Sequence, residues 1–209
     1  MKLYHYVHCP FCVRVRMACG FLNIDYDSFV LPYDDEKTPL DLTGKKMLPI
    51  AEIKGEVLNE SLDIIKTLDT SNQLQNELFN TEFNSLLDQI GKSVHSLAMP
   101  YWIWTPEFDE NSRAYFQNKK ELKRGPFKDL VLKSDNFVIT INSLLEKSIQ
   151  NELKPFFKGS SLSILDICLA SHLWGLYIVP EYQFPDVIHR YLQSVKKECK
   201  FFYHKDFWR

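Results

Sequence analysis

The stretch that most constrains the fold is HCPFC at residues 8–12, which lies between a strand-like segment and a helix-like segment. Aromatic and β-branched residues dominate residues 2–7, which predicts a strand. Over residues 10–22 apolar side chains recur at helical spacing, whereas Arg14 is expected to point away from the apolar face. Proline suits the first helical position because it has no N–H to leave unpaired. The sequence therefore predicts a strand, a tight turn and a helix whose N-cap is Cys9.

This position has chemical consequences for Cys9. A sulfur at the N-cap faces unpaired backbone N–H groups and the positive end of the helix dipole. Both favour the thiolate, so the pKa of Cys9 should lie below the ordinary value of about 8.5. Cys12 follows one turn later and can reach the same sulfur to close a disulfide. We expect Cys9 to be the nucleophile and Cys12 its partner.

A zinc site is the first alternative for a CxxC pair, with His5 or His8 nearby. A structural zinc site usually needs four ligands, and the remaining cysteines form no second pair at metal spacing. We therefore expect redox chemistry and no metal. The remaining cysteines are expected to pack in the core as small apolar residues: Cys19, Cys168 and Cys199.

Composition indicates a folded protein without a strong charge preference. The 209 residues are 45% hydrophobic and carry a net charge of −2, so a sizeable core is available and no global field attracts nucleic acid or an anionic membrane. Lys119 and Lys120 are expected on a solvated face. The longest near-apolar run, residues 164–179, contains Asp166 and His172 and is too short to span a bilayer. It predicts a buried helix.

Two features bear on localisation. No basic leader with an apolar core precedes the first strand, which argues against a secretory signal. An odd number of cysteines, five, favours a reducing compartment and reactive thiols. We expect the protein to be cytoplasmic.

The first third of the chain predicts an α+β layout of the thioredoxin type. Strand, helix and strand succeed one another up to residue 31, and a short helix follows at residues 36–42. Two strands, at 50–53 and 56–58, then flank a Lys-Gly turn, and Ser61 caps a helix that ends at Leu68. This βαβ-ββα domain, residues 1–70, is followed by a polar linker at 71–76.

The rest of the chain, residues 77–209, predicts an all-helical domain. Ser163 and Asp166 form the pattern of a capping box, in which each side chain binds the other residue's backbone N–H. Asp166 is therefore expected to be structural. Apolar residues recur at helical spacing in five segments: 78–97, 111–123, 135–153, 164–178 and 187–199.

Two dipeptides could complete a site around Cys9. Pro49 begins the third strand; a cis Leu48–Pro49 bond would turn the Leu48 backbone outward to pair with an extended peptide, although most X–Pro bonds are trans. Glu60 and Ser61 begin a helix, where N–H groups favour a carboxylate. A plain strand start and a plain N-cap remain the alternatives.

Together with the CPxC stretch, these residues resemble the glutaredoxins. Nearly the whole chain is similar to the two-domain bacterial form, which has the architecture of a glutathione transferase. The similarity extends to residues 113–116 (RAYF), 119–121 (KKE) and 163–166 (SILD). It departs at Phe11, where tyrosine is common, and at Leu48, where valine is; neither change removes a reacting group.

The resemblance implies a glutathione site. By it, Pro49 is the cis proline, the cysteinyl backbone of glutathione pairs with Leu48, and the γ-glutamyl carboxylate meets Ser61 with help from Glu60. Lys45 or Lys46 would meet the glycyl carboxylate.

The implied activity is a glutathione-dependent thiol–disulfide oxidoreductase that acts through Cys9 and Cys12 on glutathionylated and disulfide-bonded proteins. Glutathione would be a co-substrate, with no tightly bound cofactor, and we expect a monomer. The alternatives are a glutathione transferase, a non-catalytic binding module of the same fold, and an iron–sulfur carrier that bridges two chains through Cys9. For the transferase, an aromatic group could line a second pocket, although we expect it in the core: Tyr101, Trp102 and Trp104.

Overall fold

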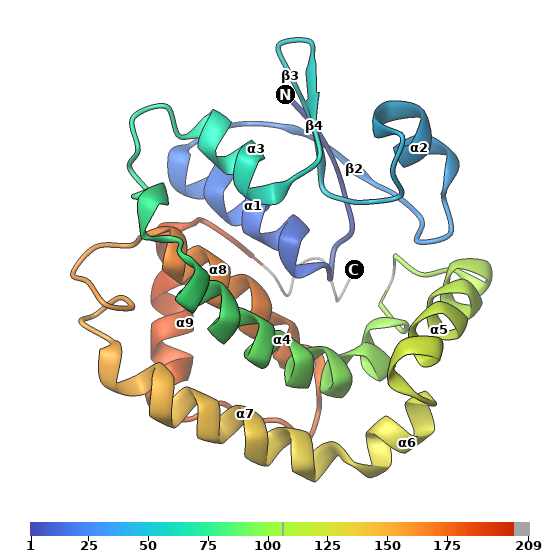
Figure 1. Cartoon of the computed structure of the whole chain (residues 1–209), viewed down its shortest axis with the longest axis vertical. Helices are drawn as coiled ribbons and strands as arrows, with labels where there is room; N and C mark the ends of the chain where they lie inside the picture. Colours follow the sequence, from blue (N-terminus) through green and yellow to red (C-terminus); the bar gives the residue numbers. More distant parts are fainter. Residues whose placement is uncertain (106, 203–209) are drawn as a thin grey trace.

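The N-terminal part is a mixed sheet packed against helices (Figure 1). The computed structural model describes residues 1–105 and 107–202. The sheet has the order β2-β1-β3-β4, in which β1 and β2 are parallel and the other neighbours are antiparallel. This confirms the predicted βαβ-ββα arrangement. The elements are β1 (Lys2–His5), α1 (Pro10–Leu22), β2 (Asp27–Val30), α2 (Lys37–Thr43), β3 (Ile50–Ile53), β4 (Glu56–Leu58) and α3 (Ser61–Leu68).

Helix α1 begins and ends where local chemistry predicts. Cys9 has extended backbone angles (φ −69°, ψ 120°) and is the N-cap, and Pro10 is the first helical residue. Asn23 ends the helix in the left-handed region at φ 56°, which asparagine tolerates better than most residues, and its N–H bonds the Cys19 and Gly20 carbonyls. The prediction for Ser61 was wrong by one position, because the extended residue before α3 is Glu60 and Ser61 is already helical.

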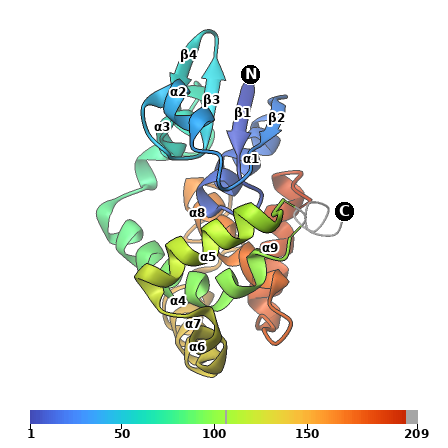
Figure 2. The same ribbon diagram turned by 90° about the vertical axis from the view of Figure 1, so that its right-hand side faces the viewer.

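The named elements described in the C-terminal part are all helices, joined by loops that hold two isolated β-bridges, and Figure 2 shows this part below the sheet. The predicted segments are present, with several differences. A short helix, α6, was missed, the helix predicted at 78–97 runs over residues 81–102, and the segments predicted at 135–153 and 164–178 are each an α-helix followed by a 3₁₀ turn. The elements are η1 (Asn76–Leu78), α4 (Thr81–Trp102), α5 (Glu110–Arg124), α6 (Phe127–Leu132), α7 (Ser134–Ser148), η2 (Gln150–Glu152), α8 (Ile164–Leu173), η3 (Trp174–Ile178) and α9 (Asp186–Glu198).

Helix α8 lies at the centre of the helical part, and all its residues are buried. The predicted capping box is present at its start: Ser163 N–H donates to Asp166 Oδ2 over 2.9 Å, and the Ser163 hydroxyl accepts from the first turn. Asp166 also accepts from Phe157 N–H (2.7 Å) and the Tyr191 hydroxyl (2.9 Å). A buried carboxylate with this set of donors anchors the helix, as expected for a structural residue.

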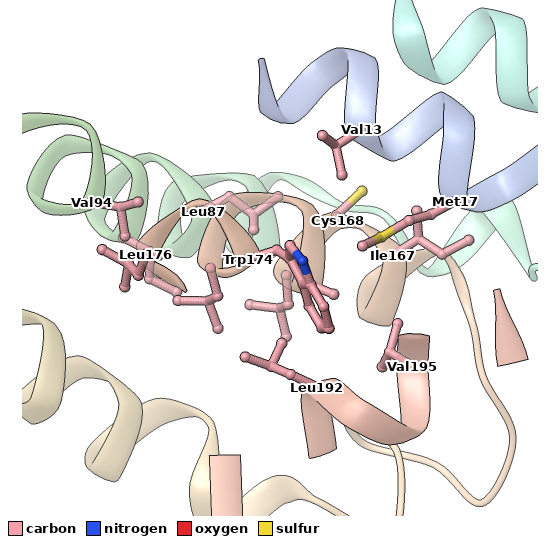
Figure 3. Packing of buried hydrophobic residues seen from close by; sticks show 14 of the residues in the cluster. Val13, Met17, Leu87, Val94, Ile167, Cys168, Trp174, Leu176, Leu192 and Val195 are labelled. Atoms are coloured by element: carbon pink, nitrogen blue, oxygen red, sulfur yellow. The ribbon is translucent and has the colours of Figure 1, made fainter. Parts of the chain in front are cut away.

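The two parts of the chain share one continuous core. Val13 and Met17 of α1 point toward Ile167 and Cys168 of α8, as Figure 3 shows. The packing is tight at Gly20, since a Cβ there would lie 1.8 Å from the carbonyl oxygen of Cys199. Helix α1 is thus covered by α3 on one side and by the helical part on the other.

Burial confirms the core prediction for the three remaining cysteines, but the positions of Arg14 and Trp104 differ from what the sequence indicated. Cys19, Cys168 and Cys199 are fully buried. Arg14, expected to point away from the apolar face of α1, is only 3% exposed, because α8 covers the side of α1 that the apolar periodicity left open. Of the aromatic group, Trp102 is buried, Tyr101 is partly buried, and Trp104 is exposed. Among the described helices, none has the length and apolarity needed to cross a bilayer.

Candidate active site

The site is built around Cys9 at the N-terminus of α1, with Cys12 one turn further on. Both are in the thiol form; Cys9 is partly exposed and Cys12 fully buried. The Cys9 sulfur accepts no capping hydrogen bond of regular geometry, so the N–H groups of the first turn act on it as nearby dipoles. Cys12 Sγ accepts from the Tyr6 N–H at 3.4 Å. Only Cys9 is thus placed to meet a substrate.

The two sulfurs have opposite acidities. Hydrogen bonding from the Cys12 thiol is the largest cause that lowers the pKa of Cys9, to about 6; burial opposes it, while nearby backbone N–H groups and His8 add to it. Burial raises the pKa of Cys12 well above its usual value, and donation to Cys9 raises it further. At neutral pH the pair is therefore a Cys9 thiolate beside a protonated Cys12, as N-cap chemistry predicts.

Leu48 lies against the thiol pair. Tyr6, Cys12, Leu48 and Ile50 form a small buried cluster, and Cys9 packs on its edge. The Leu48–Pro49 peptide bond is cis, as the resemblance implied. The structure therefore brings Cys9, Cys12 and Leu48 together at the N-terminus of α1.

Ser61 is linked to the same helix through a buried arginine. The Arg14 guanidinium donates from Nη1 to the Ser61 hydroxyl over 3.2 Å, and its Cζ lies 5.0 Å from the Phe11 ring centroid. Arg14 Nε has no hydrogen-bond partner, and no carboxylate in residues 1–105 and 107–202 pairs with this cation. Glu60 is exposed. The start of α3 thus offers a hydroxyl backed by a buried positive charge.

Four aromatic and basic side chains line one side of the site and are called the wall here: Tyr33, Tyr115, Lys46 and Lys120. Lys46 Nζ lies 4.0 Å from the Tyr115 ring centroid and 3.3 Å from Glu36 Oε1. Lys120 Nζ lies 5.6 Å from the Tyr33 ring centroid. Burial lowers the pKa of Lys120 and a Cys9 thiolate opposes this. Lys120 was expected on a solvated face, but it is partly buried beside the rings of Tyr33 and Phe116.

The two predicted lysines differ in placement. Lys46 belongs to the wall and its side chain is 14% exposed, whereas Lys45 is exposed and points to no described aromatic ring. Of the two, the geometry favours Lys46 as the group that faces a ligand near Cys9.

One carboxylate of the site was missed from the sequence. Glu107 Oε2 accepts from Val7 N–H over 2.7 Å, and Oε1 accepts from His8 N–H over 3.3 Å and pairs with His8 Nδ1. Because 99 residues separate Glu107 from His8, no local pattern could have joined them. Arg14 and Tyr33 were missed for the same reason.

The described residues bring no three His, Cys, Asp or Glu side chains close enough to hold a metal ion. Two large hollows of about 1100 and 950 Å³ have linings that do not include Cys9. The larger is lined by Tyr26 and Ser28 and reaches Val7 and Glu107, and the other lies between α4 and α7.

Comparisons with known proteins agree with this arrangement. Residues 3–75 match the family described as glutathione S-transferase, N-terminal domain, and residues 82–205 match glutaredoxin 2, C terminal domain. Glutaredoxin 2 of Escherichia coli K12 is 31% identical over 207 residues, which cover 96% of each chain.

Solved structures give the same relationship. Glutaredoxin 2 of Salmonella typhimurium, solved in complex with glutathione, superposes with a TM-score of 0.87 at 30% identity over 99% of this chain and 97% of that one. A glutathione transferase of Phanerochaete chrysosporium shares the fold, with a TM-score of 0.79 at 16% identity over 96% and 97%. The chain therefore belongs to the glutaredoxin 2 family of glutathione-dependent oxidoreductases, and its architecture is a thioredoxin-like sheet domain joined to a transferase-like helical domain.

Proposed function

We propose that Cys9 is the nucleophile and Cys12 the second thiol of a glutathione-dependent reductase of glutathionylated and disulfide-bonded proteins. The observation that carries this is the opposed acidity of the pair: the pKa of Cys9 is lowered to about 6 while that of Cys12 is raised. A thiolate with a pKa near or below ambient pH is both available for attack and a good leaving group. Membership of the family supports the same reading.

In the monothiol route, the Cys9 thiolate attacks the glutathione sulfur of a protein–glutathione mixed disulfide. The protein sulfur leaves as a thiolate and takes a proton from water, and a Cys9–glutathione disulfide forms. The thiolate of a second glutathione then attacks the glutathione sulfur of that intermediate. Oxidised glutathione leaves and the Cys9 thiolate is restored.

In the dithiol route, the Cys9 thiolate attacks one sulfur of a protein disulfide. The other protein sulfur leaves as a thiolate and takes a proton from water, and a mixed disulfide between Cys9 and the protein forms. Cys12, after losing its proton, attacks Cys9 Sγ; the remaining protein sulfur leaves as a thiolate and a Cys9–Cys12 disulfide forms. Two glutathione molecules then reduce that disulfide by successive exchange, and oxidised glutathione leaves.

The proposed glutathione site runs from Leu48 to the start of α3. The Salmonella relative was solved with glutathione, and this chain covers nearly all of that protein. The γ-glutamyl carboxylate would meet Ser61 and the first N–H groups of α3, with the Arg14 charge behind them and Glu60 at the amino end. The Leu48 backbone, held by Pro49, would pair with the cysteinyl part, and Lys46 would meet the glycyl carboxylate.

The test is a pair of serine substitutions assayed with a glutathionylated peptide and with a plain peptide disulfide. Cys9→Ser should abolish the reduction of both substrates. Cys12→Ser should leave deglutathionylation intact and slow disulfide reduction. Cys168→Ala, which removes a buried thiol of α8 that is not part of the pair, is the control.

Substantial turnover by Cys9→Ser would show that the nucleophile is misassigned, and equal loss of both activities in Cys12→Ser would remove its proposed role. Conjugation of a chloronitrobenzene substrate that survives Cys9→Ser would favour the transferase instead.

The lysines provide a matched comparison. Lys46→Ala should raise the KM for glutathione by a few fold, because charge-assisted hydrogen bonds contribute about 1.5–3 kcal/mol when buried and less when solvated. Lys45→Ala should have the smaller effect. The reverse order would place the glycyl end of glutathione on the other side of the loop.

Three further expectations complete the proposal. The free thiols fit a reducing compartment such as the cytoplasm. A monomer remains our expectation, measurable by light scattering. The division into residues 1–70 and 77–209, joined by 71–76, can be probed by limited proteolysis, which should cut first in the exposed part of that linker.

A further inference from the structure

A buried carboxylate from the helical part closes the turn that leads into the nucleophile. Glu107 lies between α4 and α5, and its oxygens accept the backbone N–H groups of Val7 (2.7 Å) and His8 (3.3 Å). The same carboxylate pairs with His8 Nδ1. The side chains of His8 and Glu107 are 4% and 5% exposed. These contacts fix the backbone immediately before Cys9 from outside the sheet domain.

The ionised form of Glu107 is favoured in spite of its burial. Burial by itself would raise the pKa of Glu107, but the charge of His8, a hydrogen bond from its ring and the two backbone N–H groups outweigh this and lower the pKa. His8 precedes Cys9, and its positive charge lowers the pKa of that thiol. Glu107 and the Cys9 sulfur are thus linked electrostatically through His8.

The surroundings hold the His8 ring in one place. Its neighbours are the rings of Tyr6, Tyr33, Trp102, Phe108 and Phe116, with centroids 5.1–6.3 Å away. These aromatic side chains supply packing but, apart from the tyrosine hydroxyls, no titrating group.

Other titratable groups face the pair or the nucleophile. Burial lowers the pKa of His95, and the charge of His8 contributes to the same shift. Tyr6, Tyr33 and Lys120 face Cys9, as does Cys12. The phenols are neutral at neutral pH because burial raises the pKa of Tyr6 and Tyr33 well above the usual value. The basic side chains beside the sulfur are therefore His8 and Lys120, and among the described residues His8 is the one that contacts a buried carboxylate.

We propose that Glu107 is a positioning residue that acts on Cys9 through His8: it holds the β1–α1 turn in place and keeps a cationic ring beside the nucleophilic sulfur. The helical part thereby sets the reactivity of a thiol that belongs to the sheet part. The inference rests on the proposed role of Cys9 as nucleophile.

The test follows the titration of Cys9 by the rate of alkylation with iodoacetamide between pH 4.5 and 9, with the modified residue identified by mass spectrometry. Glu107→Gln keeps the shape and one of the two backbone acceptors, replaces the other oxygen by an NH2 group and removes the charge. His8→Phe keeps the ring packing and removes the cation. A single neighbouring charge shifts a pKa by about 1–3 units, so each variant should raise the midpoint by about one unit and slow alkylation at pH 6 about five-fold.

Two further variants separate positioning from general stability. If Glu107 acts through His8, the double variant Glu107→Gln/His8→Phe should shift the midpoint no further than the larger single shift. Asp69→Asn is the control: Asp69 is 4% exposed and also accepts two backbone N–H groups, of Gln73 and Leu74, but it has no imidazole partner. It should lower thermal stability and leave the Cys9 midpoint unchanged.

An unchanged midpoint in Glu107→Gln, additive shifts in the double variant, or an equal shift in Asp69→Asn would each overturn the inference. Alkylation needs no turnover, so this outcome is independent of the proposed function. Should Cys9→Ser retain activity while Glu107→Gln still moves the midpoint, the proposed nucleophile fails and the electrostatic link stands.

Discussion

Removal of the Cys12 thiol should make Cys9 a weaker acid. In the structure, hydrogen bonding from Cys12 is the largest cause that lowers the pKa of Cys9 to about 6. Cys12→Ala removes that donor and adds no charge. Cys12→Ser keeps a donor at the same place, because a hydroxyl can replace the S–H and can also accept from the Tyr6 N–H that Cys12 Sγ now binds.

The magnitude follows from the strength of one charge-assisted hydrogen bond. Such bonds contribute about 1.5–3 kcal/mol, and an S–H donor belongs at the lower end of that range. One pKa unit corresponds to about 1.4 kcal/mol, so the pKa of Cys9 should rise by about one unit, from about 6 to about 7. At pH 6 the thiolate fraction then falls from about one half to about one tenth.

The assay is the pH dependence of Cys9 alkylation in the wild type and the two variants. Cys12→Ala should react about five-fold more slowly at pH 6 and equally fast above pH 8.5, where Cys9 is ionised in each protein. Cys12→Ser should remain within about half a unit of the wild type. A wild-type midpoint in Cys12→Ala, or an equal loss of rate at every pH, would refute the idea that Cys12 stabilises the thiolate by donation.

Buried groups give three further expected outcomes. As pH rises from 6 to 8.5, the free energy of unfolding of the wild type should increase by about 3 kcal/mol relative to Cys9→Ser. The pKa of Cys9 is lower in the folded than in the unfolded state, so the stabilisation is complete above the unfolded pKa and is lost as pH falls through about 6. Urea unfolding at stepped pH measures the difference between the two proteins, and a difference that does not change with pH would contradict the prediction. Asp166→Ala should cost about 2–5 kcal/mol in the same assay by leaving four buried donors unpaired, while the alkylation of Cys9 in the folded protein is unchanged. Gly20→Ala should lower the melting temperature far more than Gly159→Ala, since the added Cβ would lie 1.8 Å from the Cys199 carbonyl oxygen in the first case and 3.6 Å from its nearest neighbour in the second; equal melting temperatures would mean that α1 is free to shift.

Local signals in the sequence were sufficient where local chemistry fixes the structure. Pro10 begins α1 and the helix ends after residue 22 as predicted, and Ser163 with Asp166 starts α8. These residues satisfy or replace backbone groups within a few positions of themselves, so short spacing carries the information. The acidity predicted for Cys9 has the same origin.

The sequence-based predictions failed where packing against a distant part of the chain determines whether a side chain is buried. Periodicity showed that α1 has an apolar face, but it could not show that α8 would cover Arg14 as well. Lys120 looked like part of a solvated cluster and lies instead beside two aromatic rings. The Glu107–His8 pair depends on how the two parts of the chain dock, and a sequence pattern over a few residues does not contain that information.

The position of α1 between two layers limits how far this protein can be treated as modular. Val13 and Met17 lie in the core that the sheet and helical parts share. A fragment ending near residue 75 would present those side chains to water, and an exposed apolar stripe of this kind promotes aggregation. A minimal thiol reductase cut from this chain would therefore need polar replacements along one side of its own catalytic helix. In engineering or in recombination, the smallest segment that can be transferred as a module is therefore the full chain.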